Sequence, residues 1–166
     1  MNTPEKREFK TEELLIGAAR EEDAEALLAL QMLAYQSEAI LYQNWDIPPL
    51  VEPMETVRAA FDDALFLKAT YGEARRLVGS VRTRVEAGTG YVGRLFVHPD
   101  FQGRGIGASL LRAVEQGLPQ VRRFELFTGN RSTRNLSLYQ RMGYTPFREE
   151  RLSDEVALVF LEKILG

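Results

Sequence analysis

A glycine-rich segment near the middle of the chain has the spacing of an anion-binding loop. Glycines stand at positions 103, 105 and 107, after the turn His98-Pro99-Asp100 and at the start of a helical pattern that opens at Ile106. The first backbone N–H groups of a helix are unpaired, and the helix dipole is positive there. Glycines leave these groups uncovered, so the segment can hold a diphosphate, with Arg104 adding positive charge. The glycines alone are equally consistent with a turn that allows tight packing.

The common nucleotide-binding patterns are absent from this segment. A P-loop needs Lys followed by Ser or Thr, whereas Gly107 is followed by Ala108 and Ser109. The dinucleotide pattern G-x-G-x-x-G fails as well, because Leu110 stands where the last glycine should be. Neither pattern therefore explains the loop.

Two motifs together resemble those of the GCN5-related N-acetyltransferase (GNAT) superfamily. The segment Val97–Gly107 resembles the acetyl-CoA signature Q/R-x-x-G-x-G/A, whose core is met by Gln102, Gly105 and Gly107. The segment Asn135–Tyr144 resembles the second signature, N-x-x-x-Y-x-x-x-G-F/Y. The two occur in the family's order, with one expected strand between them. The first half of the chain agrees with the family only in the layout of its elements.

The resemblance implies an acetyl-CoA site built from one strand end, one loop and one helix. Backbone N–H groups from Gln102 to Ala108 would hold the pyrophosphate, with help from Arg104. The strand ending at Val97 would bulge and splay from strand 124–128, and pantetheine would lie in the gap. A backbone N–H near Phe96 or Val97 would polarise the thioester carbonyl. The implied cofactor-binding residues are Leu95, Phe96, Val97, Gln102, Gly103, Arg104, Gly105, Ile106, Gly107, Ala108, Asn135 and Tyr139. No metal is implied.

By the same resemblance, Tyr139 is the catalytic general acid. Attack by an amine expels CoA as a thiolate, and a thiol has a pKa of about 8.5, so a donor with a higher pKa can reprotonate it. Asn135 lies one helical turn earlier and faces the same way, where it would contact pantetheine. The alternatives are an ordinary packing position for Tyr139 and a surface or capping role for Asn135.

The base that keeps the acceptor amine neutral is not identified by sequence context. Glu38, Asp46, Glu52 and Glu125 have suitable chemistry, and each could equally be a solvated surface carboxylate. His98 lies in the proline turn, where a structural role is expected. We therefore assign no base from the sequence.

Aromatic residues occur in the segment that covers the acceptor in this family. Tyr35, Tyr42 and Trp45 lie near acidic residues, a combination that suits a cationic amine. Tyr35 is also a candidate core residue, and Trp45 a candidate anchor of its loop. The expected partner is an amine-bearing acceptor, either a small molecule or a protein.

The elements around these motifs are expected to form one α/β (α+β) domain over residues 1–166. Hydrophobic patterns predict strands at 14–18, 65–71, 77–85, 91–97, 124–128, 147–152 and 156–161. Helical spacing predicts helices at 24–35, 55–63, 106–117 and 133–142, the last ended by Gly143. The result is a GNAT-like mixed central sheet of about seven strands flanked by about four helices. Residues 43–53, with three prolines, should form an irregular loop, and residues 1–10 a flexible N-terminal segment.

Composition excludes several classes of site. The chain has no cysteine, which rules out disulfides, thiolate catalysis, zinc fingers and iron–sulfur clusters. Its single histidine rules out a multi-histidine metal site. A net charge of −3 argues against nucleic acid as a partner. No apolar run is long enough to span a membrane, and the N-terminus does not resemble a signal peptide, so a cytoplasmic location is expected.

Charge is unevenly placed along the chain. Residues 100–151 contain nine arginines and five acidic residues, whereas residues 1–99 contain eleven basic and sixteen acidic ones. An anionic ligand would prefer the first of these two regions and a cationic ligand the second. Chance scatter of surface charge explains the same asymmetry.

The sequence as a whole predicts an acetyl-CoA-dependent N-acetyltransferase that transfers the acetyl group directly to a primary amine in a ternary complex. The absence of cysteine agrees with transfer without a covalent intermediate. The alternative is a non-catalytic acyl-CoA-binding sensor or regulatory module on the same fold. An unrelated nucleotide-phosphate binder would require the second motif to be accidental. A homodimer is possible, as in many members of the family.

Overall fold

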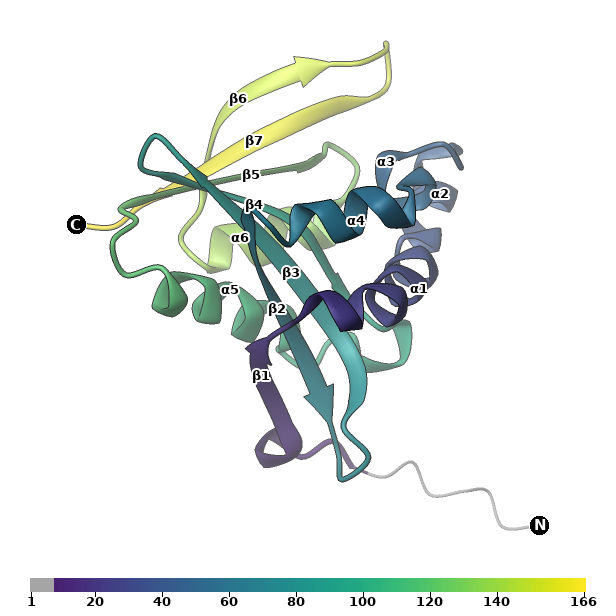
Figure 1. Cartoon of the computed structure of the whole chain (residues 1–166). Helices are drawn as coiled ribbons and strands as arrows, with labels where there is room; N and C mark the ends of the chain where they lie inside the picture. The colour runs from purple at the N-terminus through teal and green to yellow at the C-terminus, as the bar shows by residue number, and fades with distance from the viewer. Residues whose placement is uncertain (1–7) are drawn as a thin grey trace.

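A single seven-stranded sheet organises the computed structural model, which describes residues 8–166 (Figure 1). Its spatial order is β1-β2-β3-β4-β5-β7-β6. Neighbouring strands are antiparallel except for β4 and β5, the one parallel pair among the described residues. The strands are β1 (Leu14–Ala18), β2 (Ala64–Tyr71), β3 (Arg76–Glu86), β4 (Thr89–Val97), β5 (Arg123–Gly129), β6 (Thr145–Arg151) and β7 (Ala157–Ile164). The expected seven-stranded mixed sheet is confirmed.

The four expected helices are present, and two short ones accompany them. The expected helices are α1 (Ala24–Ala34), α4 (Met54–Ala60), α5 (Ile106–Gly117) and α6 (Thr133–Arg141). The additional helices are α2 (Gln36–Tyr42) and α3 (Pro48–Val51). The prediction that residues 43–53 form only irregular structure was therefore wrong. Proline has the φ of a helical residue and needs no N–H partner at a first position, so Pro48 begins α3 rather than preventing it.

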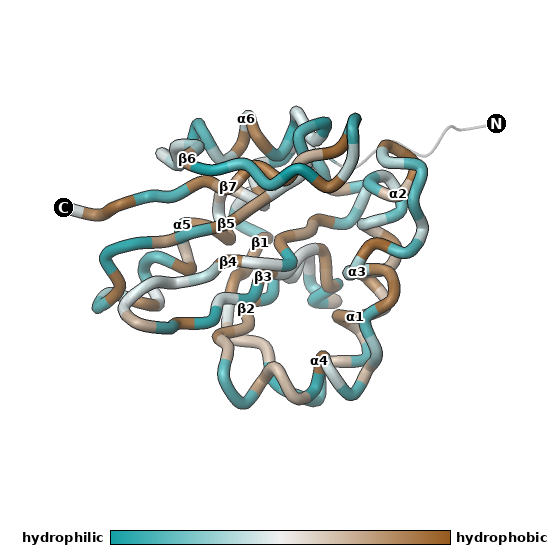
Figure 2. Tube along the Cα trace, turned by 90° about the horizontal axis from the view of Figure 1, so that it is seen from above, coloured by the Kyte–Doolittle hydropathy of each residue, from teal (hydrophilic) through white to brown (hydrophobic). Residues whose placement is uncertain are grey.

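The helices cover both faces of the sheet. A side chain at Gly79 of β3 would meet Leu110 and Ile106 of α5, whereas Arg82, three residues later, contacts Gln31 of α1. Successive strand residues point to opposite faces, so α5 and α1 lie on opposite sides of β3. The view from above shows the strands as a middle layer between α6 on one side and α4 on the other (Figure 2).

The largest core cluster lies between α5 and the sheet. It contains Leu110, Leu111, Val81 and Phe124, all without exposed surface. Tyr139 and Tyr144 extend this cluster under α6. The helix α6 packs directly on α5, because a side chain at Gly107 would come within 3.1 Å of Leu138 Cδ2.

The strands β4 and β5 separate soon after they begin. Their parallel pairing covers only the residues from Thr89 to Tyr91 on β4 and from Arg123 to Glu125 on β5. Further along, β4 carries an extra residue relative to β3, since Arg82 pairs with Gly93 while Ser80 pairs with Phe96. The expected bulge and splay of this strand are thus both confirmed.

The start of the described chain is held by contacts to β2 and to the glycine-rich loop. Phe9 stacks on Tyr71 with ring centroids 4.8 Å apart, and the Lys10 N–H donates to the Tyr71 hydroxyl at 2.9 Å. The expectation of a flexible segment over residues 1–10 falls, for residues 1–7, outside the described part of the chain. None of the helices in residues 8–166 has the length and apolar character that crossing a bilayer requires.

Candidate active site

A groove of about 730 Å³ runs along the end of β4, beyond the point where β4 stops pairing with β5. Three parts of the chain line it: the end of β4 with the loop and the start of α5 up to Arg112, the segment 131–142 at α6, and the segment 34–41 across the end of α1 and most of α2. The sheet therefore supplies one wall, and helices from its two opposite faces supply the others.

The glycines of the loop serve two different purposes. Gly103 and Gly105 have φ of +75° and +79°, in the left-handed region that other residues adopt at a cost. Gly105 is the N-cap of α5, and a side chain there would meet no atom within 4 Å, so its backbone is open to the groove. Gly107 is instead the packing glycine, since it allows the close approach of Leu138. The close packing that the sequence left open is therefore found at Gly107, whereas Gly105 leaves the loop backbone uncovered, as anion binding would require.

Most of the site residues expected from the sequence line this groove. These are Leu95, Phe96, Val97, Gln102, Gly103, Gly105, Ile106, Gly107, Ala108 and Asn135. Arg104 and Tyr139 are not part of the lining. The Arg104 guanidinium instead lies over the ring of Phe9, 5.6 Å from its centroid.

Four other arginines line the groove, and sequence reasoning did not single them out. They are Arg112, Arg131, Arg134 and Arg141. Arg134 donates to Gln102 Oε1 at 2.5 Å, so it ties α6 to the loop. The only signal in the sequence was the excess of arginine over residues 100–151, which did not say which arginines converge. A diphosphate at this end of the groove would meet positive charge from α5 and α6.

The backbone of β4 turns some of its polar groups away from β3, toward the groove. The His98 N–H donates to Val78 O at 2.7 Å, so His98 faces β3. Alternation along an antiparallel pair makes Phe96 face β3 too, and turns the polar groups of Leu95 and Val97 toward the gap. Val97 O accepts from Gln102 Nε2 at 3.4 Å, and Leu95 O accepts from the Tyr35 hydroxyl at 3.4 Å. An N–H aimed at a ligand in the gap therefore belongs to Val97 or Leu95 rather than to Phe96.

Tyr139 lies beneath the groove, with 6% of its surface exposed. Burial raises the pKa of its hydroxyl above the ordinary value, and the nearby Tyr35 and Tyr144 hydroxyls act in the same direction. The group therefore stays protonated across the physiological pH range. Asn135, one turn earlier, donates to Thr128 Oγ1 at 3.3 Å and so joins α6 to β5 at the gap.

Tyr35 closes the groove from the α1 side. Burial raises its pKa to about 12, although the Arg94 guanidinium opposes the shift. Its ring meets Phe96 edge to face, with centroids 6.1 Å apart. Tyr35 is thus both a packing residue and part of the groove wall. Trp45, by contrast, is 57% exposed and is not part of the lining.

Of the candidate bases, Glu38 is the one that lines the groove. It accepts a hydrogen bond from Ser132 Oγ at 2.7 Å. Ser132 in turn accepts one from the Tyr42 hydroxyl at 2.7 Å, and Tyr42 accepts from the Arg131 N–H at 3.1 Å. This chain of hydrogen bonds fixes the Glu38 carboxylate between α2 and the start of α6.

The other candidates are engaged elsewhere. Glu52 is paired with Arg82, and Glu125 with Arg123 at 2.9 Å. Asp46 is exposed and does not contribute to the groove. His98 Nδ1 accepts from the Asp100 N–H at 3.0 Å, which gives it the structural role expected in the turn.

The chain was compared with known proteins. Residues 33–165 match the family described as the acetyltransferase (GNAT) domain. Among curated proteins, the UPF0157 protein YqkA of Bacillus subtilis (strain 168) is 29% identical over 121 residues, which is 73% of this chain. The match covers 34% of that relative, so this chain spans about a third of its length.

Solved structures share the fold at low sequence identity. The PaiA N-acetyltransferase of Thermoplasma acidophilum, solved in complex with coenzyme A, aligns with a TM-score of 0.72 and 19% identity over 91% of this chain and 98% of that one. The ribosomal-protein-S18-alanine N-acetyltransferase of Escherichia coli aligns with a TM-score of 0.71 and 16% identity, over 92% and 94%. The family match covers most of the chain and both signature motifs, and from this we conclude that the chain belongs to the GNAT family of acetyltransferases.

Proposed function

We propose that this enzyme transfers the acetyl group of acetyl-CoA directly to a primary amine in a ternary complex. The observation that carries the proposal is the continuity of the groove: it runs from the glycine loop at the start of α5 along the end of β4, beyond the point where β4 stops pairing with β5. One extended ligand with a diphosphate at one end and a thioester at the other fits this arrangement. Family membership and the coenzyme A in a solved relative give independent support.

In this proposal the loop and the arginines hold the cofactor. Backbone N–H groups from Gln102 to Ala108 receive the pyrophosphate, and Arg134 contributes charge from α6. Pantetheine lies along Leu95–Val97, where the N–H groups of Leu95 and Val97 face the gap. Acetyl-CoA supplies an activated acetyl group, and the N–H of Val97 or Leu95 polarises its carbonyl as a fixed dipole. Arg104 was expected to contact a phosphate by resemblance to the family, and its position over the Phe9 ring does not support that role.

The proton transfers are assigned to two side chains, Glu38 in the wall of the groove and Tyr139 beneath it. An ammonium cannot attack, so the acceptor must lose a proton, and Glu38 is the carboxylate placed to take it. The amine nitrogen then bonds to the acetyl carbon, the carbon–sulfur bond breaks, and the thiolate sulfur takes a proton from the Tyr139 hydroxyl. The nitrogen gives up its second proton as the amide forms, so that this proton, passed through solvent, restores the tyrosine, and Glu38 releases the first proton to water. A buried tyrosine is a weak acid, and it remains able to donate because a desolvated thiolate is a strong base.

The assay for this proposal is release of free thiol from acetyl-CoA in the presence of a panel of primary amines. We expect thiol release that depends on both substrates, with an acetylated amine identified by mass spectrometry. If acetyl-CoA binds without thiol release from any amine, the chain is a sensor rather than an enzyme. If acetyl-CoA does not bind, the assignment of the groove is wrong.

A further inference from the structure

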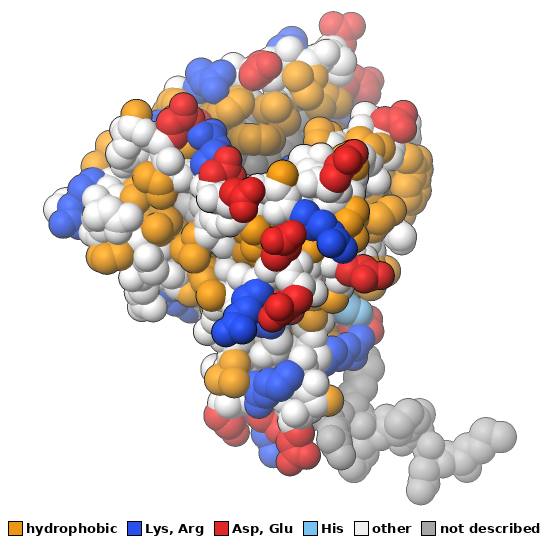
Figure 3. All heavy atoms as spheres, viewed as in Figure 1, with side chains coloured by type: hydrophobic (Ala, Val, Ile, Leu, Met, Phe, Trp, Pro, Cys, Tyr) orange, Lys and Arg blue, Asp and Glu red, His pale blue; other side chains and the backbone are white. Residues whose placement is uncertain are grey.

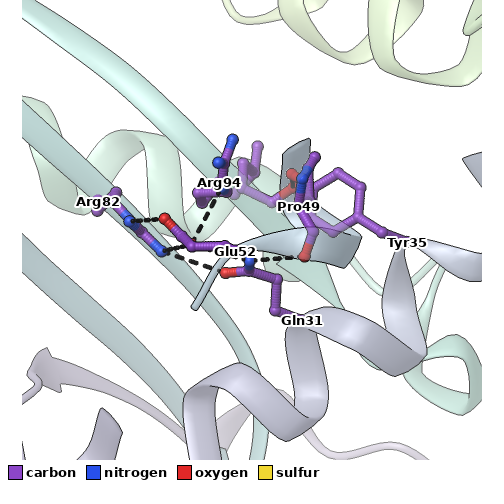
Figure 4. A network of polar contacts seen from close by, with 7 residues as sticks. Gln31, Tyr35, Pro49, Glu52, Arg82 and Arg94 are labelled. Atoms are coloured by element: carbon purple, nitrogen blue, oxygen red, sulfur yellow. Dashed lines mark hydrogen bonds and ion pairs between the residues drawn. The ribbon is translucent and has the colours of Figure 1, made fainter. Parts of the chain in front are cut away.

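We infer that the acceptor is an amino acid, and that Arg94 binds its carboxylate. This inference rests on the proposed function, because it names the substrate class of the same site. The inference is based on a partly buried cluster of charged side chains at the bulge of β4. The cluster has an excess of positive charge, and it lies next to the residues expected to hold the thioester. Figure 4 shows this cluster between α1, α3 and the strands.

The cluster contains two guanidinium groups and one carboxylate. Arg82 binds Glu52 through two hydrogen bonds, of 2.8 and 3.1 Å. Gln31 donates to the same carboxylate at 3.0 Å and to Pro49 O at 2.9 Å. Arg94 reaches Glu52 only through Nε, at 3.5 Å (Figure 4). The carboxylate is therefore saturated by Arg82 and Gln31, and the terminal nitrogens of Arg94 have no partner among residues 8–166.

The surplus charge is held where solvation is poor. The Glu52 side chain is 6% exposed and that of Arg94 is 24% exposed. A charge removed from water needs a counter-charge or several hydrogen bonds to offset the loss of hydration. Arg82 and Arg94 share the single carboxylate of Glu52, which Arg82 holds more closely, so the cluster keeps one positive charge that no carboxylate among the described residues balances. An incoming carboxylate would balance it.

The backbone places Arg94 at the site rather than elsewhere on the sheet. Arg94 is the residue of the bulge, with φ of +48°, a conformation that costs free energy for a residue with a side chain. Bulges redirect side chains and are frequent beside active sites. The next residue, Leu95, lines the cofactor groove. An anion bound by Arg94 would therefore lie beside Leu95, one of the residues expected to hold the thioester.

A second hollow adjoins Arg94 on the acceptor side of the sheet. It measures about 280 Å³, and its charged lining consists of Arg82, Arg84, Arg94 and a single acid, Asp63. Tyr91 and Phe127 provide apolar wall. Figure 3 shows this face of the molecule, on which basic and acidic side chains are mixed and the surface is hollowed below the β6–β7 hairpin. A polyamine would be repelled by such a lining, whereas an amino acid side chain and carboxylate would fit it.

Groups of both signs act on Tyr35. The Arg94 guanidinium, from the sheet, lowers the pKa of its hydroxyl, and the Glu38 carboxylate, from α2, raises it. The acceptor's ammonium would face Glu38, and its carboxylate would face Arg94. The carboxylate takes no part in bond making and only positions the amine.

The test compares each primary-amine protein amino acid with its own carboxamide in the thiol-release assay. The two members of a pair share the amine and the side chain and differ only in the carboxylate. We expect at least one acid to be used about tenfold or more better than its amide in kcat/KM, the range of a charge-assisted hydrogen bond. Amides that are used as well as or better than the acids would overturn the inference while leaving the proposed function intact. No thiol release from any amine would refute the proposed function, and this inference with it.

Variants of Arg94 separate binding from a structural role. Arg94→Gln should raise KM for the acid about tenfold or more, leave kcat within about twofold, and leave the amide unaffected. Arg94→Lys should restore part of the loss because it restores the charge. The control is Arg20→Gln, which removes an exposed arginine whose side chain is 80% accessible. An equal effect of Arg94→Gln on acid and amide, or a loss confined to thermal stability, would overturn the inference.

Discussion

Replacement of Gly105 by glutamate tests whether the loop holds a diphosphate. The substitution places a carboxylate at the N-cap of α5, where a side chain meets no atom within 4 Å but the φ of +79° imposes backbone strain. At about 5 Å and an effective dielectric constant of about 20, two like unit charges repel by about 3 kcal/mol. A penalty of this size weakens binding about 200-fold.

A thermal-shift titration with acetyl-CoA measures this penalty. At a concentration of about 100 times Kd, a ligand stabilises the wild type by about 2.7 kcal/mol, and the variant by only about 0.2 kcal/mol. For a domain of this size the ligand-induced rise in Tm should fall from about 5–10 °C to less than about 1 °C.

The matched control for this variant is Gly88→Glu. Gly88 has φ of +80° against +79° for Gly105, and a side chain at either position meets no atom within 4 Å. Both variants therefore carry the same backbone strain and the same added charge, and only one of them lies at the groove. An unchanged acetyl-CoA shift in folded Gly105→Glu, or an equal loss in Gly88→Glu, would refute the assignment of the loop.

Three further predictions concern catalysis and stability. Tyr139→Phe should lower kcat by about 10²–10⁴-fold with little change in CoA affinity, measured by thiol release and calorimetry. Tyr144→Phe is its control, since that ring lies 6.2 Å away and its buried hydroxyl has no partner among the described residues; equal losses in both variants would remove Tyr139 from the mechanism. Glu38→Gln should lower kcat about 10²-fold near neutral pH, with partial recovery at high pH where the free amine is abundant, whereas Glu25→Gln on the exposed part of α1 should not. A pH–rate profile that keeps its wild-type shape would exclude Glu38 as the base. Burial alone would raise the pKa of Glu52, but hydrogen bonds from Arg82 and Gln31 outweigh it and hold the pKa below its ordinary value. The stability this group contributes is therefore present above the ordinary Glu value of 4.5 and is lost as pH falls through its lower folded-state pKa. Glu52→Gln should cost about 3 kcal/mol in urea unfolding at neutral pH and flatten the acid limb; an unchanged acid limb would contradict this pairing.

Local patterns were enough to predict the sheet and the loop. Alternation in β3 and apolar runs in most of the others mark six of the strands, and polar, exposed β6 was expected as the hairpin partner of β7. The glycine spacing before α5 marks a helix N-terminus with bare N–H groups. These signals lie within a few residues of each other, so they can be read without the tertiary structure. The short helix α3 is not predicted from the sequence if proline is taken only to interrupt helices. Pro48 occupies the first turn of α3, a position where proline is well tolerated.

The side chains that surround the site could not be predicted from local sequence patterns. Glu38 meets Ser132 across 94 positions of sequence, and Arg82 meets Glu52 across 30. Such pairs depend on how α1, α2 and α6 dock on the sheet, which no local pattern encodes. Arg104 illustrates the converse, because its place in the loop suggested a phosphate contact while its side chain turns to Phe9.

A crystal structure with bound acetyl-CoA tests the central claim most directly. The account predicts the pyrophosphate on the N–H groups of residues 102–108, pantetheine between β4 and β5, and the acetyl carbonyl oxygen within hydrogen-bond distance of the N–H of Val97 or Leu95. A pyrophosphate bound away from the loop, or pantetheine outside the gap between the two strands, would contradict it.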